Sequence, residues 1–279
     1  MAAPWRSAGR TQQGQARLRN EDAFLDDPRR SCWAVADGMG GYRNGDFASQ
    51  WVIRQLAAVS AQGNLDQRIQ AVRSCLQGVN QGLRRAWIEP GAPADATMGS
   101  TVVALLLEKG RAACLWAGDS RCYLWRGQSL YQLSKDHSLL QRLMDERHLS
   151  AAQAQAYPDA RALTRAVGAG SRLHLEALEL STRPGDVFLL CSDGLYQALS
   201  HVDLGRALSM QTPQQAVERL FAGALRRPVH DDLTAVVVQP SARRHKPCVC
   251  WLGVITLSMS WAEGVWALCT VRATCCTSN

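Results

Sequence analysis

Residues 34–46 read AVADGMGGYRNGD, a short apolar approach to Asp37 followed by a cluster of glycines. The segment CWAVAD (32–37) predicts a short buried strand, because turn residues bound a brief apolar run. Glycines after such a strand lack Cβ atoms and let the backbone come close to a small group. A carboxylate beside bare backbone suits a hard cation, which binds carboxylate and carbonyl oxygens together. A plain glycine turn with a solvated Asp37 explains this stretch at least as well, so the rest of the chain must distinguish the two.

The composition is that of an ordinary globular protein. The chain has 279 residues, 47% hydrophobic and 20% charged, which allows one large domain or two ordinary ones. Its first 20 residues are polar and lack the apolar segment of a signal peptide, so we expect a cytoplasmic protein. Five cysteines fall singly in predicted strands and helices, which indicates buried, reduced thiols and no disulfide or zinc framework. They are Cys32, Cys75, Cys114, Cys122 and Cys191.

The net charge of +7 does not indicate a nucleic-acid partner. Part of it lies in the final stretch, where Arg243, Arg244, Lys246 and Arg272 accompany a single Glu263. The first 240 residues contain no lysine/arginine run interleaved with aromatic residues. We interpret their basic residues as a solvated face.

Apolar periodicity predicts strands and helices in an order that excludes regular βαβ alternation. Helices are expected at 47–59, at 69–87, where apolar residues recur every three or four positions, and at 138–157 and 213–227. Thr212 and Pro213 mark the start of the last of these helices. Strands are expected at 101–107, 112–118, 121–125, 129–133, 186–191 and 233–238. Consecutive strands with helices before, between and after them favour an α+β fold of antiparallel sheets covered by helices.

The acidic residues stand at the ends of these strands. Asp37, Asp119 and Asp193 each follow one directly, Asp231 precedes the last one, and Glu21 and Asp22 lead toward the strand at 32–37. Burying an unpaired carboxylate costs several kcal/mol, and repelling carboxylates stay ionised together only when cations hold them. Oxygen ligands without a histidine or cysteine cluster favour Mg²⁺ or Mn²⁺ over zinc. For any single acid, capping of a turn is an adequate alternative.

Eight segments resemble, in order and spacing, the signature blocks of the metal-dependent serine/threonine protein phosphatases, the PPM or type 2C family. The resemblance covers residues 7–238. The segments are RLRNED (17–22), VADGMGGYRNGDFAS (35–49), MGSTVV (98–103), AGDSRCYL (117–124), LSKDHS (133–138), LTRAVG (163–168), LLCSDGL (189–195) and DDLTAVVV (231–238). The start, WRSAGRTQQGQARLRNEDAFLDD (5–27), further resembles the small single-domain phosphatases found with bacterial type VI secretion systems.

The resemblance implies a central sandwich of two antiparallel sheets flanked by helices, with two Mn²⁺ or Mg²⁺ ions at one end and a third, weaker ion in bacterial members. Asp37 would bridge two ions, the Gly38 carbonyl would bind one, and Asp193 and Asp231 would complete the other. Glu21 and Asp22 would act directly or through water, and Asp119 would hold the third ion with Asp193. Arg17 would bind the phosphate. An ion-activated water would then hydrolyse phosphoserine and phosphothreonine in proteins.

Several positions depart from the family pattern and leave the general acid open. Met39 stands where some members have a histidine, and Tyr42 and Tyr157 also replace frequent histidines. The usual arginine of the segment over the site is displaced to Arg161. His137 matches the family motif, yet its place after a strand favours packing of a turn over proton transfer.

The finer resemblance implies a monomer that acts on phosphorylated proteins, with a Ser/Thr kinase and its forkhead-associated substrate as partners. Two other functions stay open. One is an inactive phosphoprotein-binding scaffold, which has no need of the intact acidic set. The other is a two-metal phosphodiesterase or nuclease, which should show a stronger basic groove.

We expect a phosphatase domain at 1–240 and a Cys/Trp-rich tail at 241–279 outside it. The tail has a charge-free run from Pro247 to Ala262, short of the ~20 residues needed to span a bilayer. A longer run would include Glu263, and placing this charged side chain at the centre of a bilayer costs about 2.5 kcal/mol or more. One interpretation is a membrane-surface anchor that is acylated at Cys275 and Cys276. The other, which we favour, is sequence from a shifted or read-through end without a selected role, so we expect no membrane association.

Overall fold

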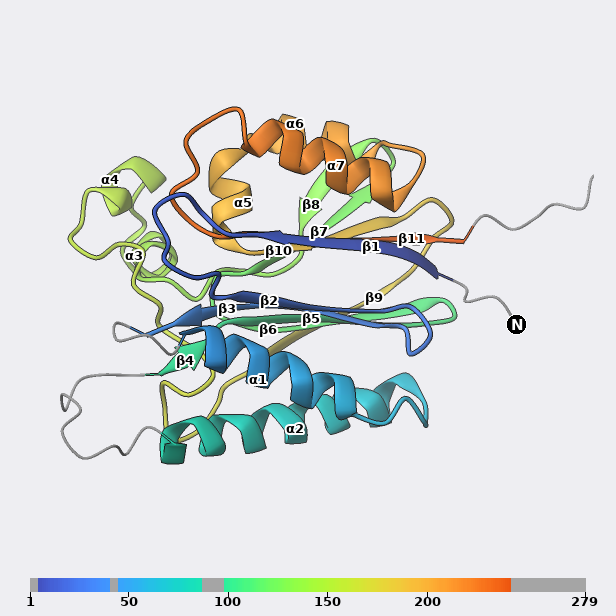
Figure 1. The fold of residues 1–279 in the computed structure, drawn as a ribbon, viewed down its shortest axis with the longest axis horizontal. Coiled ribbons are helices and arrows are strands. Elements are labelled where there is room, and N and C mark those ends of the chain that lie inside the picture. The colour runs from blue at the N-terminus through green and yellow to red at the C-terminus, as the bar shows by residue number, and fades with distance from the viewer. Residues whose placement is uncertain (1–4, 41–44, 87–97, 242–279) are drawn as a thin grey trace, which may run out of the picture. The chain divides into compact units, whose positions relative to one another are not determined.

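Two antiparallel β-sheets stack face to face between two layers of helices (Figure 1). The computed structural model describes residues 5–40, 45–86 and 98–241. The expectations for Tyr42, for Trp87 and for the tail beyond Ser241 fall outside these residues. The predicted α+β class, with antiparallel sheets between helices, is confirmed.

The first sheet has the strand order β1-β11-β10-β7-β8. Its strands are β1 (Trp5–Gln12), β7 (Arg121–Arg126), β8 (Ser129–Gln132), β10 (Val187–Cys191) and β11 (Leu233–Pro240). Three helices cover its outer face: α5 (Asp193–Ala198), α6 (His201–Leu208) and α7 (Pro213–Ala224). Pro213 occupies the first turn of α7 and Thr212 caps it, as the sequence predicts.

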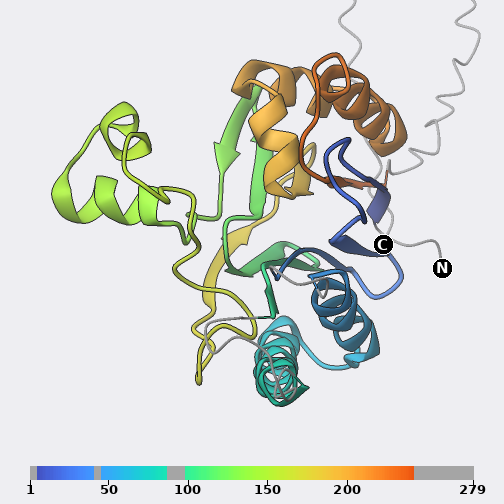
Figure 2. The ribbon, with the colours of Figure 1, turned by 60° about the vertical axis from the view of Figure 1, so that its left-hand side comes forward.

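The second sheet has the order β2-β3-β5-β6-β9, and the short β4 also pairs with β3. Its strands are β2 (Asp22–Asp27), β3 (Cys32–Met39), β4 (Gly99–Ser100), β5 (Val102–Glu108), β6 (Arg111–Ala117) and β9 (Glu176–Ser181). Helices α1 (Gly45–Ala58) and α2 (Leu65–Ala86) cover its outer face. Helices α3 (Leu139–Arg147) and α4 (Ala151–Gln155) form an arm beside the sandwich (Figure 2).

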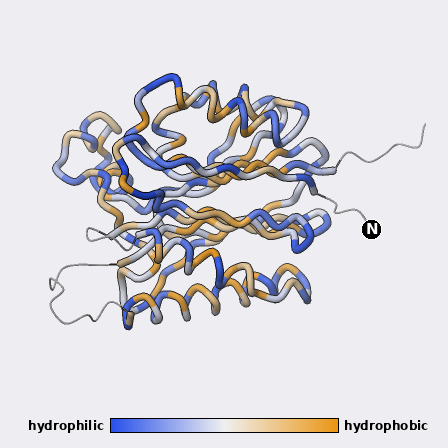
Figure 3. Tube along the Cα trace, in the orientation of Figure 1, coloured by the Kyte–Doolittle hydropathy of each residue, from blue (hydrophilic) through white to orange (hydrophobic). Residues whose placement is uncertain are grey.

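Alternation along the strands divides the apolar residues between the two faces of each sheet. Trp33 and Val35 of β3 pack between the sheets with Phe188 of the other sheet, whereas Ala34 and Ala36 pack under the helices. Figure 3 shows the hydrophobic residues concentrated along the central strands of both sheets. The same alternation places Asp37 in the row of Trp33 and Val35, at the end of the space between the sheets.

Four strands have no counterpart in the sequence predictions: the short β4, and β1, β2 and β9, which are edge strands of their sheets. An edge strand is partly solvated, so its apolar alternation is weak. The short helices α5 and α6 were not predicted either.

The single helix expected at 138–157 is wrong, because the chain forms two helices there. His148 has a positive φ of 52°, which ends α3, and Ser150 starts α4 with a capping box. The helix expected at 213–227 ends at Ala224.

The cysteines among the described residues are free thiols, four of them buried and Cys75 half-buried, as predicted. Within the described ranges, none of the helices combines the length and the apolar character needed to cross a bilayer.

Candidate active site

The predicted acids meet at one end of the sandwich, on the left in Figure 1. Asp37 lies near the end of β3, opposite Asp22 at the start of β2 in the antiparallel ladder. From the other sheet, Asp193 follows β10 and Asp231 precedes β11. Asp119 follows β6. Antiparallel neighbours put the end of one strand beside the start of the next, which is why acids from both kinds of position converge.

Asp37 is the centre of this group. Burial raises the pKa of the Asp37 carboxyl well above its ordinary value, and the negative charges of Asp22, Asp193, Asp119 and Asp231 raise it further. Its backbone is fixed at Thr101, between β4 and β5: the Asp37 N–H donates to Thr101 Oγ1 at 3.0 Å, and the Thr101 N–H donates to the Asp37 carbonyl at 2.8 Å. The carboxylate lies among like charges, an arrangement that favours a cation.

Asp22 closes the space between the sheets. Its Oδ2 accepts a hydrogen bond from Ser192 Oγ at 2.6 Å, and its Oδ1 is buried with no hydrogen-bond partner within the described ranges. Burial raises the pKa of Asp22 to about 7, although hydrogen bonds from Ser192 and Thr234 lower it. An orphaned buried carboxylate oxygen costs free energy unless a proton or a cation satisfies it.

Asp119 and Asp193 form a second pair of interacting acids. Burial raises the pKa of Asp119 to about 7, and the charge of Asp193 contributes next. The pKa of Asp193 is also raised, by burial and then by Asp231. Asp193 Oδ1 is buried and finds no hydrogen-bond partner in the described part of the chain, while its Oδ2 accepts from Gln197 Nε2 at 2.6 Å.

Arg17 lies at the exposed side of the group, against two of the acids. Its guanidinium donates from Nε and Nη2 to Asp231 Oδ1 at 2.9 and 2.6 Å, and from Nη1 to Glu21 Oε2 at 3.4 Å. Burial alone would lower the pKa of Arg17, but the hydrogen bond and charge of Asp231 raise it overall. For the Glu21 carboxyl, burial raises the pKa, and the positive charge of Arg17 opposes this increase. Further N–H groups of the guanidinium stay free for an oxyanion.

Gly38 is required by close backbone approach. Its N–H donates to the Glu21 carbonyl at 3.0 Å. A Cβ atom on Gly38 would overlap the Gly45 carbonyl oxygen and would lie 2.8 Å from the Glu21 carbonyl oxygen. The glycine after Asp37 thus brings the strand end, the start of α1 and the Glu21 loop together, which leaves bare backbone beside the acids.

The residues at this end fit divalent cations. Within residues 5–40, 45–86 and 98–241 no three Asp, Glu, His or Cys side chains stand in a ready-made ligand arrangement. Protein donors instead hold Asp22, Asp193 and Asp231, through Ser192, Gln197 and Arg17. The carboxylates are nevertheless close enough for each to raise the pKa of Asp37, and two buried oxygens lack partners. An all-oxygen donor set of this kind suits Mg²⁺ or Mn²⁺.

Asp232 is an important residue that the sequence reasoning passed over. It is 3% exposed and accepts hydrogen bonds from the Gly14 N–H at 2.8 Å and the Glu21 N–H at 2.7 Å. It therefore ties the loop of Arg17 and Glu21 to the start of β11. The paired acids of HDDLT were the available signal, since a buried second aspartate needs donors of its own.

His137 packs a turn, as predicted. The backbone N–H of His137 donates to the Gly118 carbonyl at 2.9 Å, and the ring nitrogen Nδ1 accepts from the Gly118 N–H at 3.1 Å. The other ring nitrogen lies 3.1 Å from Glu176 Oε1. Burial lowers the pKa of His137, which keeps the imidazole neutral. His137 thus fixes the turn that carries Asp119.

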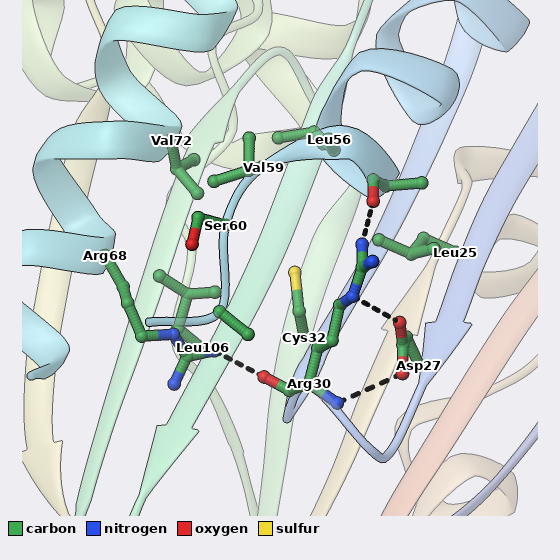
Figure 4. Close-up of a pocket in the computed structure, with 12 residues that line it drawn as sticks. Leu25, Asp27, Arg30, Cys32, Leu56, Val59, Ser60, Arg68, Val72 and Leu106 are labelled. Carbon is green, nitrogen blue, oxygen red and sulfur yellow. Dashed lines mark hydrogen bonds and ion pairs between the residues drawn. The ribbon is translucent and has the colours of Figure 1, made fainter. Parts of the chain in front are cut away.

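A pocket at the opposite end of β3 does not take part in this site (Figure 4). It is lined by Arg30 and Cys32, near the start of β3, and by Arg68 of α2, which donates to the Arg30 carbonyl at 2.7 Å. Its volume of about 10 Å³ is enough for one water molecule at most. Burial raises the pKa of the Cys32 thiol to about 12, so the thiol is unreactive at neutral pH.

The protein phosphatase 2C family model matches residues 10–233 of the chain. The chain belongs to the protein phosphatase 2C family. The family indicated by the sequence motifs is therefore confirmed, and the two-sheet architecture is that of the solved structures of the family.

Two known proteins illustrate the similarity. The serine/threonine protein phosphatase PstP of Mycobacterium tuberculosis is 33% identical over 232 residues, which make up 83% of this chain and 44% of PstP. The chain thus spans less than half the length of this relative. A structure of the PstP catalytic domain with two manganese ions has a TM-score of 0.71 and 31% identity, covering 84% of this chain and 97% of that one.

The structure of PppA, described as a key regulatory component of T6SS in Pseudomonas aeruginosa, is also similar. It has a TM-score of 0.78 and 40% identity, covering 85% of this chain and 98% of PppA. This protein phosphatase 2C chain therefore matches PppA over almost the whole of that structure.

Proposed function

We propose that this chain is a metal-dependent protein phosphatase that hydrolyses phosphoserine and phosphothreonine in proteins. The observation that carries the proposal is the group of acids around Asp37, whose charges raise the pKa of the Asp37 carboxyl, with Arg17 at its exposed side. The relative PstP, named a serine/threonine protein phosphatase and solved with two manganese ions, supports the substrate class and the use of manganese.

Each residue of the site has a role in this reaction. Asp37, Asp193, Asp231 and the Gly38 carbonyl would hold two Mn²⁺ or Mg²⁺ ions, with Glu21 and Asp22 acting directly or through water. Asp119 and Asp193 would hold a third. When bound, such ions supply a hydroxide at neutral pH and offset the charge of the phosphoryl group.

Arg17 would orient the phosphate ester. A guanidinium can hold two phosphate oxygens in a planar fork, which aligns the phosphorus for in-line attack and offsets charge in the transition state. Arg17 is held beside the acids by Asp231 and Glu21, so the phosphate would lie next to the ions. The neutral His137 faces Glu176 and the Gly118 turn, so it supports the site without donating a proton to the leaving group.

One experiment distinguishes this function from the two alternatives. The full chain is assayed with Mn²⁺ on a phosphothreonine peptide and on single-stranded DNA, with and without excess chelator. We expect metal-dependent release of phosphate from the peptide alone, and an about 1,000-fold loss of kcat/KM in Asp193→Asn, equivalent to about 4 kcal/mol. Peptide binding without turnover would support a scaffold, and cleavage of DNA would support a phosphodiesterase.

We further propose that the physiological setting is type VI secretion control, with a Ser/Thr kinase and its phosphorylated forkhead-associated substrate as partners of a cytoplasmic monomer. The similarity to PppA supports this setting. Removing a dianionic phosphate would reset a switch that an arginine cluster reads. Deleting the gene should raise phosphorylation of such a substrate in cells where the kinase is active. Unchanged phosphorylation would contradict the type VI secretion setting and leave only the general protein phosphatase function.

A further inference from the structure

Gln197 bridges a cationic side chain and one of the site acids. Its Nε2 donates to Asp193 Oδ2 at 2.6 Å, and its Oε1 accepts from Arg161 Nη1 at 2.6 Å. Gln197 and Asp193 both lie on α5, four residues apart. Arg161 belongs to a different segment, after α4. A side-chain amide suits this place because it carries a donor and an acceptor without charge.

The bridge determines how Asp193 presents its oxygens. Oδ2 is taken by Gln197, and Oδ1 is buried and has no hydrogen-bond partner among the residues that the structure describes. A ligand carboxylate whose second oxygen is fixed by a hydrogen bond has a defined orientation toward a cation. Gln197 itself is exposed, so its bond to Asp193 contributes to orientation more than to the stability of the core.

The segment of Arg161 is also connected to Asp119. The carbonyls of Ala160 and Ala162 accept from the Leu140 and Leu139 N–H groups at 2.7 and 2.9 Å. Two residues further on, the Thr164 N–H donates to the His137 carbonyl at 2.8 Å. His137 holds Gly118, the residue before Asp119. Residues 160–164, at the base of the α3–α4 arm in Figure 2, therefore touch the supports of both Asp119 and Asp193.

We propose that Gln197 is a positioning residue, which orients Asp193 for cation binding and links this acid to the 160–164 segment through Arg161. The proposal rests on the proposed function, since it assumes that Asp193 is a cation ligand. Arg161 acts on Asp193 through the Gln197 amide, because its guanidinium fixes the carbonyl end and thereby turns the NH₂ end toward the carboxylate.

The test measures Mn²⁺ binding to the full-length protein by titration calorimetry, independently of turnover. Gln197→Met keeps the length of the side chain but has no N–H donor, and we expect it to weaken Mn²⁺ binding about tenfold. Gln197→Ala serves as a second variant if the methionine perturbs folding. Gln214→Ala is the matched control, because Gln214 donates to Glu218 at 2.9 Å with the same four-residue spacing on α7.

A double-mutant cycle tests the part played by Arg161. We expect Arg161→Ala to weaken Mn²⁺ binding several-fold in the wild-type background and by less than about twofold in the Gln197→Met background. If Arg161 acted through space by its charge, Arg161→Ala would instead strengthen Mn²⁺ binding, and to the same extent in both backgrounds. That result would overturn the link through Gln197. Wild-type affinity in both Gln197 variants would overturn the positioning role alone. Absence of Mn²⁺ binding by the wild type would overturn the proposed function as well.

Discussion

Asp22 and Asp37 lie directly opposite each other on β2 and β3, so two carboxylates occupy one cross-strand pair at the end of the sandwich. Like charges in such a pair are destabilising, and here burial adds to the cost. The pKa of both carboxyls is raised mainly by burial, that of Asp22 to about 7. The site thus holds electrostatic strain that protons or cations relieve.

This pair predicts how stability depends on pH in the presence of EDTA. Because the folded pKa of Asp22 is about 7 against 3.8 for an ordinary aspartate, the folded protein binds a proton between these values that the unfolded chain releases. The free energy of unfolding should therefore fall as the pH rises from about 4 to about 7. Urea unfolding at three pH values measures this slope.

Asp22→Asn is the control for the pH dependence. It keeps the shape of the side chain and an acceptor for Ser192 Oγ, so its slope should be shallower than that of the wild type. The lowered pKa of His137 acts in the opposite sense in both proteins and cancels in the difference. Equal slopes in the two proteins would show that Asp22 titrates normally.

Arg17→Ala should raise KM for a phosphopeptide without loss of metal binding. Removing a charged contact to phosphate is worth about 1.5–3 kcal/mol, or about a 10- to 100-fold rise in KM. Mn²⁺ affinity should change less than about threefold, since Arg17 is not a ligand. Arg19→Ala is the control, because Arg19 is exposed and, among the described residues, forms an ion pair with Asp46 alone, at 3.4 Å. A collapse of Mn²⁺ binding with an unchanged KM would reverse the assignment of Arg17.

Gly38→Ala should destabilise the protein by about 1–3 kcal/mol, because the new methyl group would overlap the Gly45 carbonyl oxygen. Gly78→Ala is the control: Gly78 lies inside α2, and no atom of the described residues lies within 4 Å of a Cβ atom there. The control should therefore stabilise the protein by about 0.5–1 kcal/mol. Chemical denaturation of both variants measures the difference, and a Gly38→Ala protein as stable as the wild type would contradict the close approach.

A chain that ends at Pro240 should fold, bind Mn²⁺ and be as active as the full chain. Pro240 pairs with Trp5 at the end of β11, which lies between β1 and β10, so all the strands described in the first sheet lie before the cut. Phosphopeptide assays of both proteins measure their activity. Fractionation of cells that express either protein measures their membrane association. Loss of folding on truncation, or membrane association of the full chain alone, would show that residues 241–279 have a role.

Much of the fold and of the site could be predicted from the sequence, because the information was local. Asp37, Asp119, Asp193 and Asp231 stand next to apolar runs that could only be buried strands, and an aspartate at such a position must face a strand end. The central strands and the helix that starts at Pro213 were recognised for the same reason. The edge strands β1, β2 and β9 were not, since partial solvation weakens their pattern.

The sequence by itself determined which acids, glycines and apolar rows this protein has, and therefore which face of each strand is buried. Only the tertiary structure decided which acids interact and which side chains support them. Asp232 holds the loop of Glu21 from 211 residues away in sequence, and Arg161 binds Gln197, the hydrogen-bond partner of Asp193, from 36 residues away. Hydrogen bonds of this kind depend on positions that the packing of the two sheets creates, and no local periodicity encodes them.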